Sequence, residues 1–209
     1  MDLLRHNEIN YVIRYPRAYD ASKKYPLIIF LHGAGGRDEP SENVKGFGCF
    51  GAAERFDLDA VMVAPHCQVD SWFEIFEQLQ DFVRFVASLE FIDPDRVYLM
   101  GGSMGGYTAW QLAMTRPELF AALVPICGGG MYWNAGRLKD IPIWAWHGRL
   151  DKTVFCEESE KMVAAVNKRG GNAKLTICED VAHNSWVNAF ESAELFEWML
   201  AQRRAKKEN

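Results

Sequence analysis

The chain has 209 residues, of which 49% are hydrophobic and 24% are charged, values that predict one α/β domain over residues 1–209. Its formal net charge of −5 at pH 7 argues against a nucleic-acid partner, and the basic tail at 203–209 is interpreted as a solvated helix end. No apolar run reaches the length of about 18 residues that a membrane-spanning helix needs, so no membrane contact is expected.

The N-terminal segment and the cysteines indicate a cellular compartment. The segment MDLLRHNEIN has neither the apolar core nor the small-residue cleavage site of a secretory signal. The five cysteines are scattered without a C-x-x-C pair, a pattern typical of reduced thiols rather than of disulfides or zinc ligands. We therefore expect a cytoplasmic protein without a metal ion; a secreted protein that has lost its signal peptide is the alternative.

The alternation of short apolar segments with amphipathic ones predicts the fold class. The expected strands cover residues 10–16, 26–33, 60–65, 97–102, 122–129, 141–148 and 174–180. The expected helices cover residues 71–90, 104–115, 157–169 and 187–203. Strands that alternate with helices predict an α/β fold, with a mostly parallel, twisted sheet of about seven strands and helices on both faces.

Sequence signals mark the ends of these helices. Ser71 and Glu74 have the spacing of a capping box at the start of the first helix. The second helix is expected to end before Pro117, and the third at Gly170 and Gly171. In parallel sheets ligands bind at the carboxyl ends of the strands, so the residues that follow each strand are the candidates for chemistry.

Glycines surround Ser103 in the segment VYLMGGSMGGYTAW, which joins an expected strand to an expected helix. The G-x-S-x-G pattern predicts a nucleophile elbow, in which side chains at Gly101 and Gly105 would clash with neighbouring backbone. Ser103 is then expected to have a positive φ and an exposed hydroxyl at the start of the helix. A glycine-rich turn with an incidental serine is the alternative.

A serine nucleophile needs a base, and the base needs an orienting acid. The elbow predicts the chain order serine, acid, histidine, which Asp151 and His183 satisfy in loops that follow expected strands. Asp180 is the second choice for the acid because it is too close in sequence to reach the far nitrogen of His183.

The remaining histidines and one acid are given other positions. His32 and His147 are interpreted as structural residues that hydrogen-bond loop backbone, whereas His66 either lines the pocket or lies near it. His6 is expected to be exposed before the first strand, and Asp140 to lie at the opposite end of the sheet.

An oxyanion hole and a substrate pocket are expected beside the elbow. The glycines of LHGAGG allow backbone N–H groups to turn toward Ser103, and the amides of Ala34 and Met104 are the expected donors. The tryptophans that precede or follow predicted elements are candidates to line the pocket, while Phe73 is expected in the core. The candidate pocket residues are Trp72, Trp133 and Trp186.

Taken together, the segments LHGAGG, GGSMGG, RPELFAALVPICGG, PIWAWHGRLDKTV and AHNSW resemble the α/β-hydrolases over residues 25–198. The chain looks like the serine carboxylesterases without a large lid. Predicted peptidases and feruloyl-esterase-like or polyhydroxyalkanoate-depolymerase-like members of the superfamily share these segments. The resemblance implies the α/β-hydrolase fold, and it matches Ser103 to the nucleophile, Asp151 to the acid and His183 to the base. Ala34 and Met104 match the oxyanion positions.

Two departures refine the resemblance. Dienelactone hydrolases have a cysteine where this chain has Ser103, which argues against their activity. Only the short segment 129–140 stands where many hydrolases insert a lid, so an open cleft is expected and long-chain lipase activity is not.

We therefore expect a serine hydrolase that cleaves small-molecule carboxylic esters with short or aromatic acyl groups through an acyl-enzyme, without a cofactor. A small peptidase or an acyltransferase with the same triad is the nearest alternative, and a non-catalytic binding protein with a hydrolase fold is a further one. The sequence leaves the oligomeric state and the natural ester open.

Overall fold

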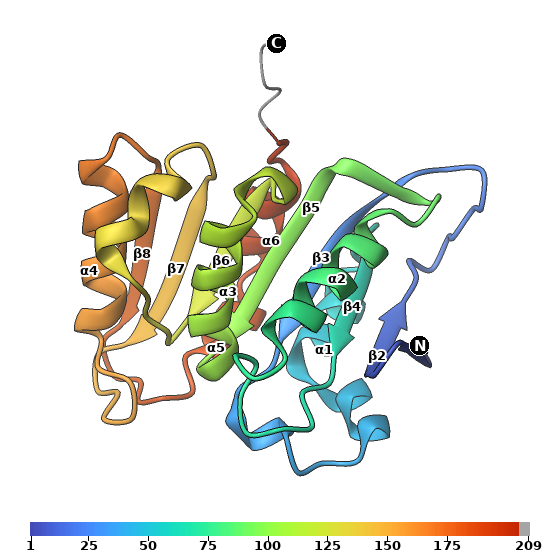
Figure 1. Cartoon of the computed structure of the whole chain (residues 1–209), viewed down its shortest axis with the longest axis horizontal. Coiled ribbons are helices and arrows are strands. Elements are labelled where there is room, and N and C mark those ends of the chain that lie inside the picture. The colour runs from blue at the N-terminus through green and yellow to red at the C-terminus, as the bar shows by residue number, and fades with distance from the viewer. Residues whose placement is uncertain (205–209) are drawn as a thin grey trace.

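The computed structural model describes residues 1–204, which form an eight-stranded sheet with helices on both faces (Figure 1). The strands lie in the order β1-β2-β4-β3-β5-β6-β7-β8. Their bounds are β1 Asp2–His6, β2 Ile9–Arg14, β3 Tyr25–Leu31, β4 Val61–Pro65, β5 Ile92–Gly102, β6 Ala122–Ile126, β7 Ile143–Gly148 and β8 Ala173–Cys178. Strands β3 to β8 pair in parallel, whereas β1 and β2 are antiparallel at one edge.

The helices divide between the two faces according to their apolar sides. One face is covered by α2 (Phe76–Ala87), α3 (Met104–Thr115) and α4 (Glu157–Lys168), and the opposite face by α1 (Gly48–Arg55), α5 (Trp186–Glu191) and α6 (Ala193–Leu200) (Figure 1). Short 3₁₀ helices occupy the loops: η1 Ala34–Gly36, η2 Ser41–Gly46, η3 Pro117–Leu119 and η4 Tyr132–Leu138. The predicted α/β fold, with a mostly parallel sheet and helices on both faces, is confirmed, and the sheet has eight strands instead of about seven.

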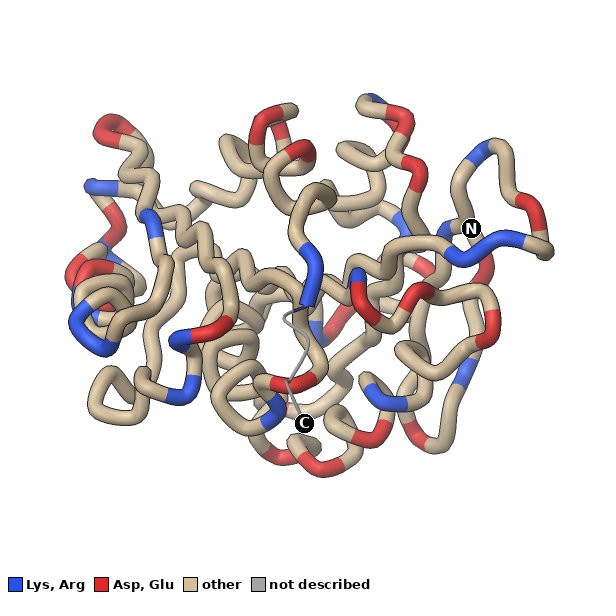
Figure 2. Tube along the Cα trace, turned by 90° about the horizontal axis from the view of Figure 1, so that it is seen from above, with Lys and Arg blue, Asp and Glu red and all other residues tan. Residues whose placement is uncertain are grey.

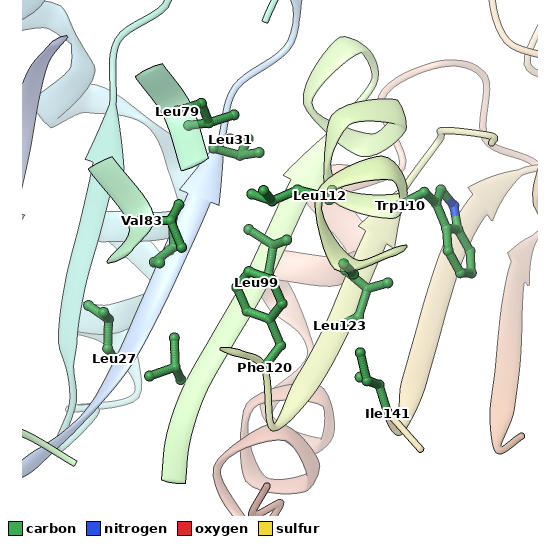
Figure 3. Packing of buried hydrophobic residues seen from close by; sticks show 14 of the residues in the cluster. Leu27, Leu31, Leu79, Val83, Leu99, Trp110, Leu112, Phe120, Leu123 and Ile141 are labelled. Atoms are coloured by element: carbon green, nitrogen blue, oxygen red, sulfur yellow. The ribbon is translucent and has the colours of Figure 1, made fainter. Parts of the chain in front are cut away.

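The core fixes α3 above the central strands. Leu99 of β5 and Leu112 of α3 are fully buried, and Leu123 of β6 lies beside them (Figure 3). Burying a side chain of this size contributes about 1.5–3 kcal/mol. The N-terminus of α3 is therefore held at the end of β5, where Ser103 lies.

Several expected elements differ from those observed. Strand β1 was missed because its sequence, DLLRH, is mostly exposed and carries charge, and Asn7 with φ of 50° turns it into β2. The first helix begins at Phe76 instead of Ser71, so the predicted capping box is wrong. The Ser71 hydroxyl accepts from the Phe73 N–H in a turn before the helix.

The C-terminal helix is divided, and helix α1 was not predicted. Ser192 adopts an extended backbone between α5 and α6, and its hydroxyl caps α6 by accepting from the Leu195 N–H at 3.2 Å. Helix α6 ends at Leu200, and Arg204 pairs with Asp95 at 2.9 Å instead of extending into solvent on a helix. Residues 205–209 of the basic tail lie outside the described part of the chain.

Charged residues of both signs alternate along the outer helices and loops, and the strands that cross the middle of the molecule are largely uncharged (Figure 2). The acidic excess is thus spread around the described surface. In the same part of the chain, every helix is too short or too polar to cross a membrane.

Candidate active site

Ser103 occupies a sharp turn between β5 and α3. Its backbone has φ of 55° and ψ of −117°, as the elbow pattern predicts. A Cβ added to Gly101 would collide with the carbonyl oxygen of Gly105, and one added to Gly105 would collide with that of Leu31. A non-glycine residue in such a conformation costs of order 1–3 kcal/mol, and the close approach explains why both flanking positions are glycine.

Ser103, His183 and Asp151 form one continuous hydrogen-bonded chain. The Ser103 Oγ lies 2.8 Å from His183 Nε2, and His183 Nδ1 lies 2.7 Å from Asp151 Oδ2. A carboxylate only accepts, so Nδ1 carries the hydrogen and Nε2 accepts from the serine hydroxyl. Ser103 follows β5, Asp151 follows β7, and His183 lies in the loop after β8. All three therefore lie at the carboxyl ends of parallel strands.

The carboxylate of Asp151 is held on both oxygens. Its Oδ1 accepts from the backbone N–H groups of Thr153 and Val154, each at 2.9 Å, and its side chain is buried. Burial alone would raise the pKa of Asp151. The hydrogen bonds from His183, Val154 and Thr153 together outweigh burial and lower this pKa below its usual range. Asp151 is therefore ionised and oriented toward His183.

The loop after β3 lies directly against the serine. A Cβ on Gly33 would lie 3.2 Å from the Cβ of Ser103. Ala34 and Met104 are the first residues of η1 and α3, positions whose N–H groups have no partner within their own helix. Both amides are therefore free of helical bonds beside the serine.

Two buried histidines hold this loop from behind. His32 donates from Nδ1 to the Gly33 carbonyl at 2.7 Å, and its Nε2 accepts from the Cys67 N–H at 2.9 Å. Burial lowers the pKa of His32 to about 4, so its ring is neutral at pH 7. His66 lies 2.9 Å from the Gly36 carbonyl and is buried, so it supports the loop without lining the pocket.

His6 and His147 complete the set of histidines. His6 is half-buried on β1, where it stacks on Phe85, instead of being exposed before the first strand. His147 hydrogen-bonds the Val154 carbonyl, in agreement with its expected contact with loop backbone.

A cavity of about 440 Å³ opens beside Ser103 and His183. Its walls carry no Asp, Glu, Lys or Arg side chain, and four aromatic rings form its apolar part. These rings belong to Phe30, Phe47, Trp186 and Phe190. The cavity therefore suits a neutral, apolar group next to Ser103.

The expected pocket residues have different fates. Trp186 lines the cavity, and its ring lies edge-on to that of His183, with 5.5 Å between the two ring centroids. Trp72 does not line it, because this side chain is fully buried and donates to the His32 carbonyl at 3.0 Å. Trp133 is 62% exposed on η4 away from the cavity, and Phe73, expected in the core, is 51% exposed.

Sequence reasoning missed the phenylalanines of the cavity. Phe47 precedes α1, a helix of only eight residues that was not predicted, and Phe30 lies within an apolar strand that indicates only burial. Phe190 lies on α5, a helix of only six residues, which is too short for its sequence pattern to show which side faces Ser103.

One group of potential metal ligands includes the same residues. Ligand atoms of Cys127, Asp151 and His183 lie within 4.8 Å of one another. Burial raises the pKa of the Cys127 thiol to about 12, and the other two side chains are hydrogen-bonded to each other. The donor set fits the hydrogen-bonded chain better than a metal centre.

Comparisons with known proteins agree on the kind of fold. The family model described as "Prolyl oligopeptidase family" matches residues 73–135. The solved structure of a thermostable esterase is 33% identical and superposes with a TM-score of 0.83, covering 94% of this chain and 60% of that one. The expectation of a hydrolase-type α/β fold is thereby confirmed.

Two curated relatives match at lower identity. Dipeptidyl-peptidase 5 of Porphyromonas gingivalis is 23% identical over 243 residues, which cover 91% of this chain and 34% of the relative. Probable feruloyl esterase C of Aspergillus terreus is 29% identical over 152 residues, which cover 69% of this chain and 56% of the relative. The chain thus spans about a third and just over half of these two relatives.

Proposed function

The chain belongs to the α/β-hydrolases, in the group that contains esterases and peptidases, and from this premise we propose that it hydrolyses carboxylic esters through a serine acyl-enzyme. The observation that carries the proposal is the hydrogen-bonded chain from Ser103 through His183 to Asp151. In this proposal the three residues are nucleophile, base and acid.

The mechanism follows from the direction of these hydrogen bonds. His183 Nε2 takes the proton of the Ser103 hydroxyl as its oxygen attacks the acyl carbon. Asp151 holds the Nδ1–H tautomer and stabilises the imidazolium that forms. The imidazolium then protonates the leaving alcohol, and a water molecule activated by His183 releases the acid.

The amides of Ala34 and Met104 are proposed to hold the oxyanion. Their positions at the starts of η1 and α3, one on each side of Ser103, support this role. A donor of this kind contributes about 2.7–4 kcal/mol to the transition state in other hydrolases. His32 and His66 hold the carbonyls of the same loop, which favours an N–H group that is oriented before the substrate binds.

The cavity supports an ester with a neutral acyl group over a substrate that carries a free amino terminus. An ammonium group that leaves water needs an anionic partner, and the cavity walls carry no Asp or Glu side chain. The aromatic walls instead fit a short aliphatic or an aromatic acyl group. The short segment between β6 and β7 leaves no room in the sequence for a large lid.

A peptidase is the second candidate, because the matched family model is that of prolyl oligopeptidases and one relative is a dipeptidyl-peptidase. Its residues would be the same, and only the substrate differs. An acyltransferase shares the same acyl-enzyme but passes the acyl group to an acceptor other than water.

Activity-based labelling tests the proposal directly. A fluorophosphonate probe is expected to label the wild-type protein at Ser103 and to leave Ser103→Ala unlabelled. Hydrolysis of 4-nitrophenyl acetate, butyrate and cinnamate is then compared with that of dipeptidyl 4-nitroanilides. Absence of labelling favours a binding protein, and a preference for the anilides favours the peptidase.

A further inference from the structure

We propose that His147 is a positioning residue that holds the carboxylate of Asp151 in place, an inference that rests on the proposed hydrolase function. Its imidazole is fully buried at the carboxyl end of β7. Its Nε2 lies 2.9 Å from the Val154 carbonyl oxygen and 3.3 Å from Asp151 Oδ2. His147 thus contacts both the acid and the turn that surrounds it.

The partners of His147 determine which nitrogen carries the hydrogen toward the acid. The Val154 carbonyl can only accept, so Nε2 is protonated. Nδ1 lies 2.7 Å from the Ser159 hydroxyl, which can donate to it or accept from it. The Ser159 hydroxyl lies 2.9 Å from the Gly128 carbonyl, which can only accept, so its single hydrogen goes either to this carbonyl or to Nδ1. The Nε2–H group therefore faces Val154 and Asp151 whether the ring is neutral or cationic.

Val154 links the Nε2–H group of His147 to the orientation of the Asp151 carboxylate. Its carbonyl accepts from His147, while its N–H donates to Asp151 Oδ1 at 2.9 Å. The same peptide turn also delivers the Thr153 N–H to Oδ1 at 2.9 Å. By holding the carbonyl of Val154, His147 keeps these two donors aimed at the carboxylate.

The other carboxylate oxygen of Asp151, Oδ2, lies close to two imidazole rings. Asp151 Oδ2 lies 2.7 Å from His183 Nδ1 and 3.3 Å from His147 Nε2. Without His147, Asp151 Oδ2 loses its second imidazole contact, and the turn loses the hydrogen bond to the Val154 carbonyl. A shift of about 1 Å in such a group lowers turnover by up to about a hundredfold. The expected loss is therefore in kcat, because neither His147 nor Asp151 lines the cavity.

Two substitutions separate positioning from simple packing. A glutamine side chain places an N–H₂ group about as far from the backbone as Nε2 of histidine, whereas asparagine reaches only the Nδ1 position. His147→Gln is expected to keep kcat within a few-fold of the wild type. His147→Asn is expected to lower kcat about ten- to hundredfold with KM changed less than twofold. Thermal unfolding of both variants provides the control for folding, because both lose the same aromatic ring.

The outcomes distinguish the inference from the proposed function. If the wild type fails to label with a fluorophosphonate, the hydrolase proposal fails. If the wild type labels and both variants lose kcat equally, in step with their Tm, His147 is only a packing residue and the inference is overturned. Ser159→Ala removes the contact at Nδ1 alone and is expected to lower kcat less than His147→Asn.

Nitrogen-15 NMR of the wild-type imidazoles gives a second test that does not depend on whether the variants fold. The His147 ring is expected to carry hydrogen on Nε2 throughout the pH range of activity. A ring with hydrogen on Nδ1 and a bare Nε2 would overturn the inference.

Discussion

The Nε2 atom of His183 lies 2.8 Å from the Oγ of Ser103, although 80 positions separate the two residues in the chain. Strands β6 and β7 lie between β5, which precedes Ser103, and β8, which precedes His183. The loop that carries His183 must therefore return across the end of β7. It is held there by a hydrogen bond of 2.9 Å from the Leu150 N–H to the Val181 carbonyl.

Gly148 at the end of β7 allows this crossing. A Cβ at Gly148 would collide with the carbonyl oxygens of Val181 and Ala182. We expect Gly148→Ala to displace the His183 loop and, under the proposed function, to lower kcat at least tenfold, since His183 moves away from Ser103. Steady-state kinetics on an activated ester provides the measurement. Gly51→Ala, on α1 in open space, is the matched control and is expected to retain wild-type kinetics.

The positive φ of Ser103 lowers the stability of the fold at the residue that the proposed activity requires. Ser103→Gly removes the cost of a positive φ and is expected to raise the free energy of unfolding by about 1 kcal/mol, the strain relieved being partly offset by added unfolded-state entropy. Ser103→Ala keeps the strain and is expected to unfold near the wild-type temperature. Both variants are expected to lose several orders of magnitude in turnover. Equal Tm values for the two variants would contradict the assignment of strain to this residue.

Asp151 links acid stability to the candidate site. Its pKa is lower in the folded than in the unfolded protein, so its stabilising contribution is present above the unfolded value of about 3.9 and is lost as pH falls through the folded value. We expect the free energy of unfolding of Asp151→Asn to depend less on pH than that of the wild type below about pH 4. Denaturant titrations at a series of pH values measure the slope. Asn should also lower kcat by roughly 10³–10⁴, as the wrong imidazole tautomer is then favoured.

His32 has its effect at a higher pH. Burial lowers its pKa to about 4, while the unfolded chain takes up a proton near pH 6.5. The unfolded state thus binds more protons between these values, so stability is complete above about pH 6.5 and falls toward pH 4. The full difference is on the order of 3 kcal/mol. Urea unfolding at pH 7 and pH 4.5 should show a smaller change in His32→Asn than in the wild type; an equal change would contradict the role of His32.

Gly102 lines the cavity beside Ser103. A Cβ there would meet only the Trp186 ring at 3.9 Å, so alanine fits without a collision and takes space from the cavity. We expect Gly102→Ala to lower kcat/KM for an aromatic ester about tenfold or less and to leave an acetyl ester almost unchanged. The ratio of the two constants is the measurement. A uniform loss for both esters would indicate a displaced Ser103 instead.

The predictions from the sequence were most accurate where backbone geometry restricts which residue can occupy a position. Glycines at 101 and 105 leave few conformations for the intervening serine, and parallel strands bring the residues after them to one edge, so Ser103, Asp151 and His183 could be selected together. Aromatic side chains carry no such constraint. Trp72 and Trp186 both lie near the starts of predicted helices, yet one is fully buried and the other lines the cavity.

Element boundaries failed where tertiary contacts override a local pattern. The apolar periodicity from residue 71 continues into α2, but the indole of Trp72 bonds the His32 carbonyl and holds this segment in a turn. The periodicity through 187–203 likewise conceals the break at Ser192, where the backbone is extended and the hydroxyl caps α6.

The break at Ser192 divides what would otherwise be one helix into two helices with different contacts. Helix α6 packs Leu195, Phe196 and Met199 into the interior, whereas α5 presents Trp186 and Phe190 to the cavity. Under the proposed function, we expect substitutions on α5 to change which acyl groups the cavity accepts while α6 keeps its contacts with the core. Because the chain breaks at Ser192, α5 is a useful target for directed evolution that leaves the packing of the C-terminal helix in place.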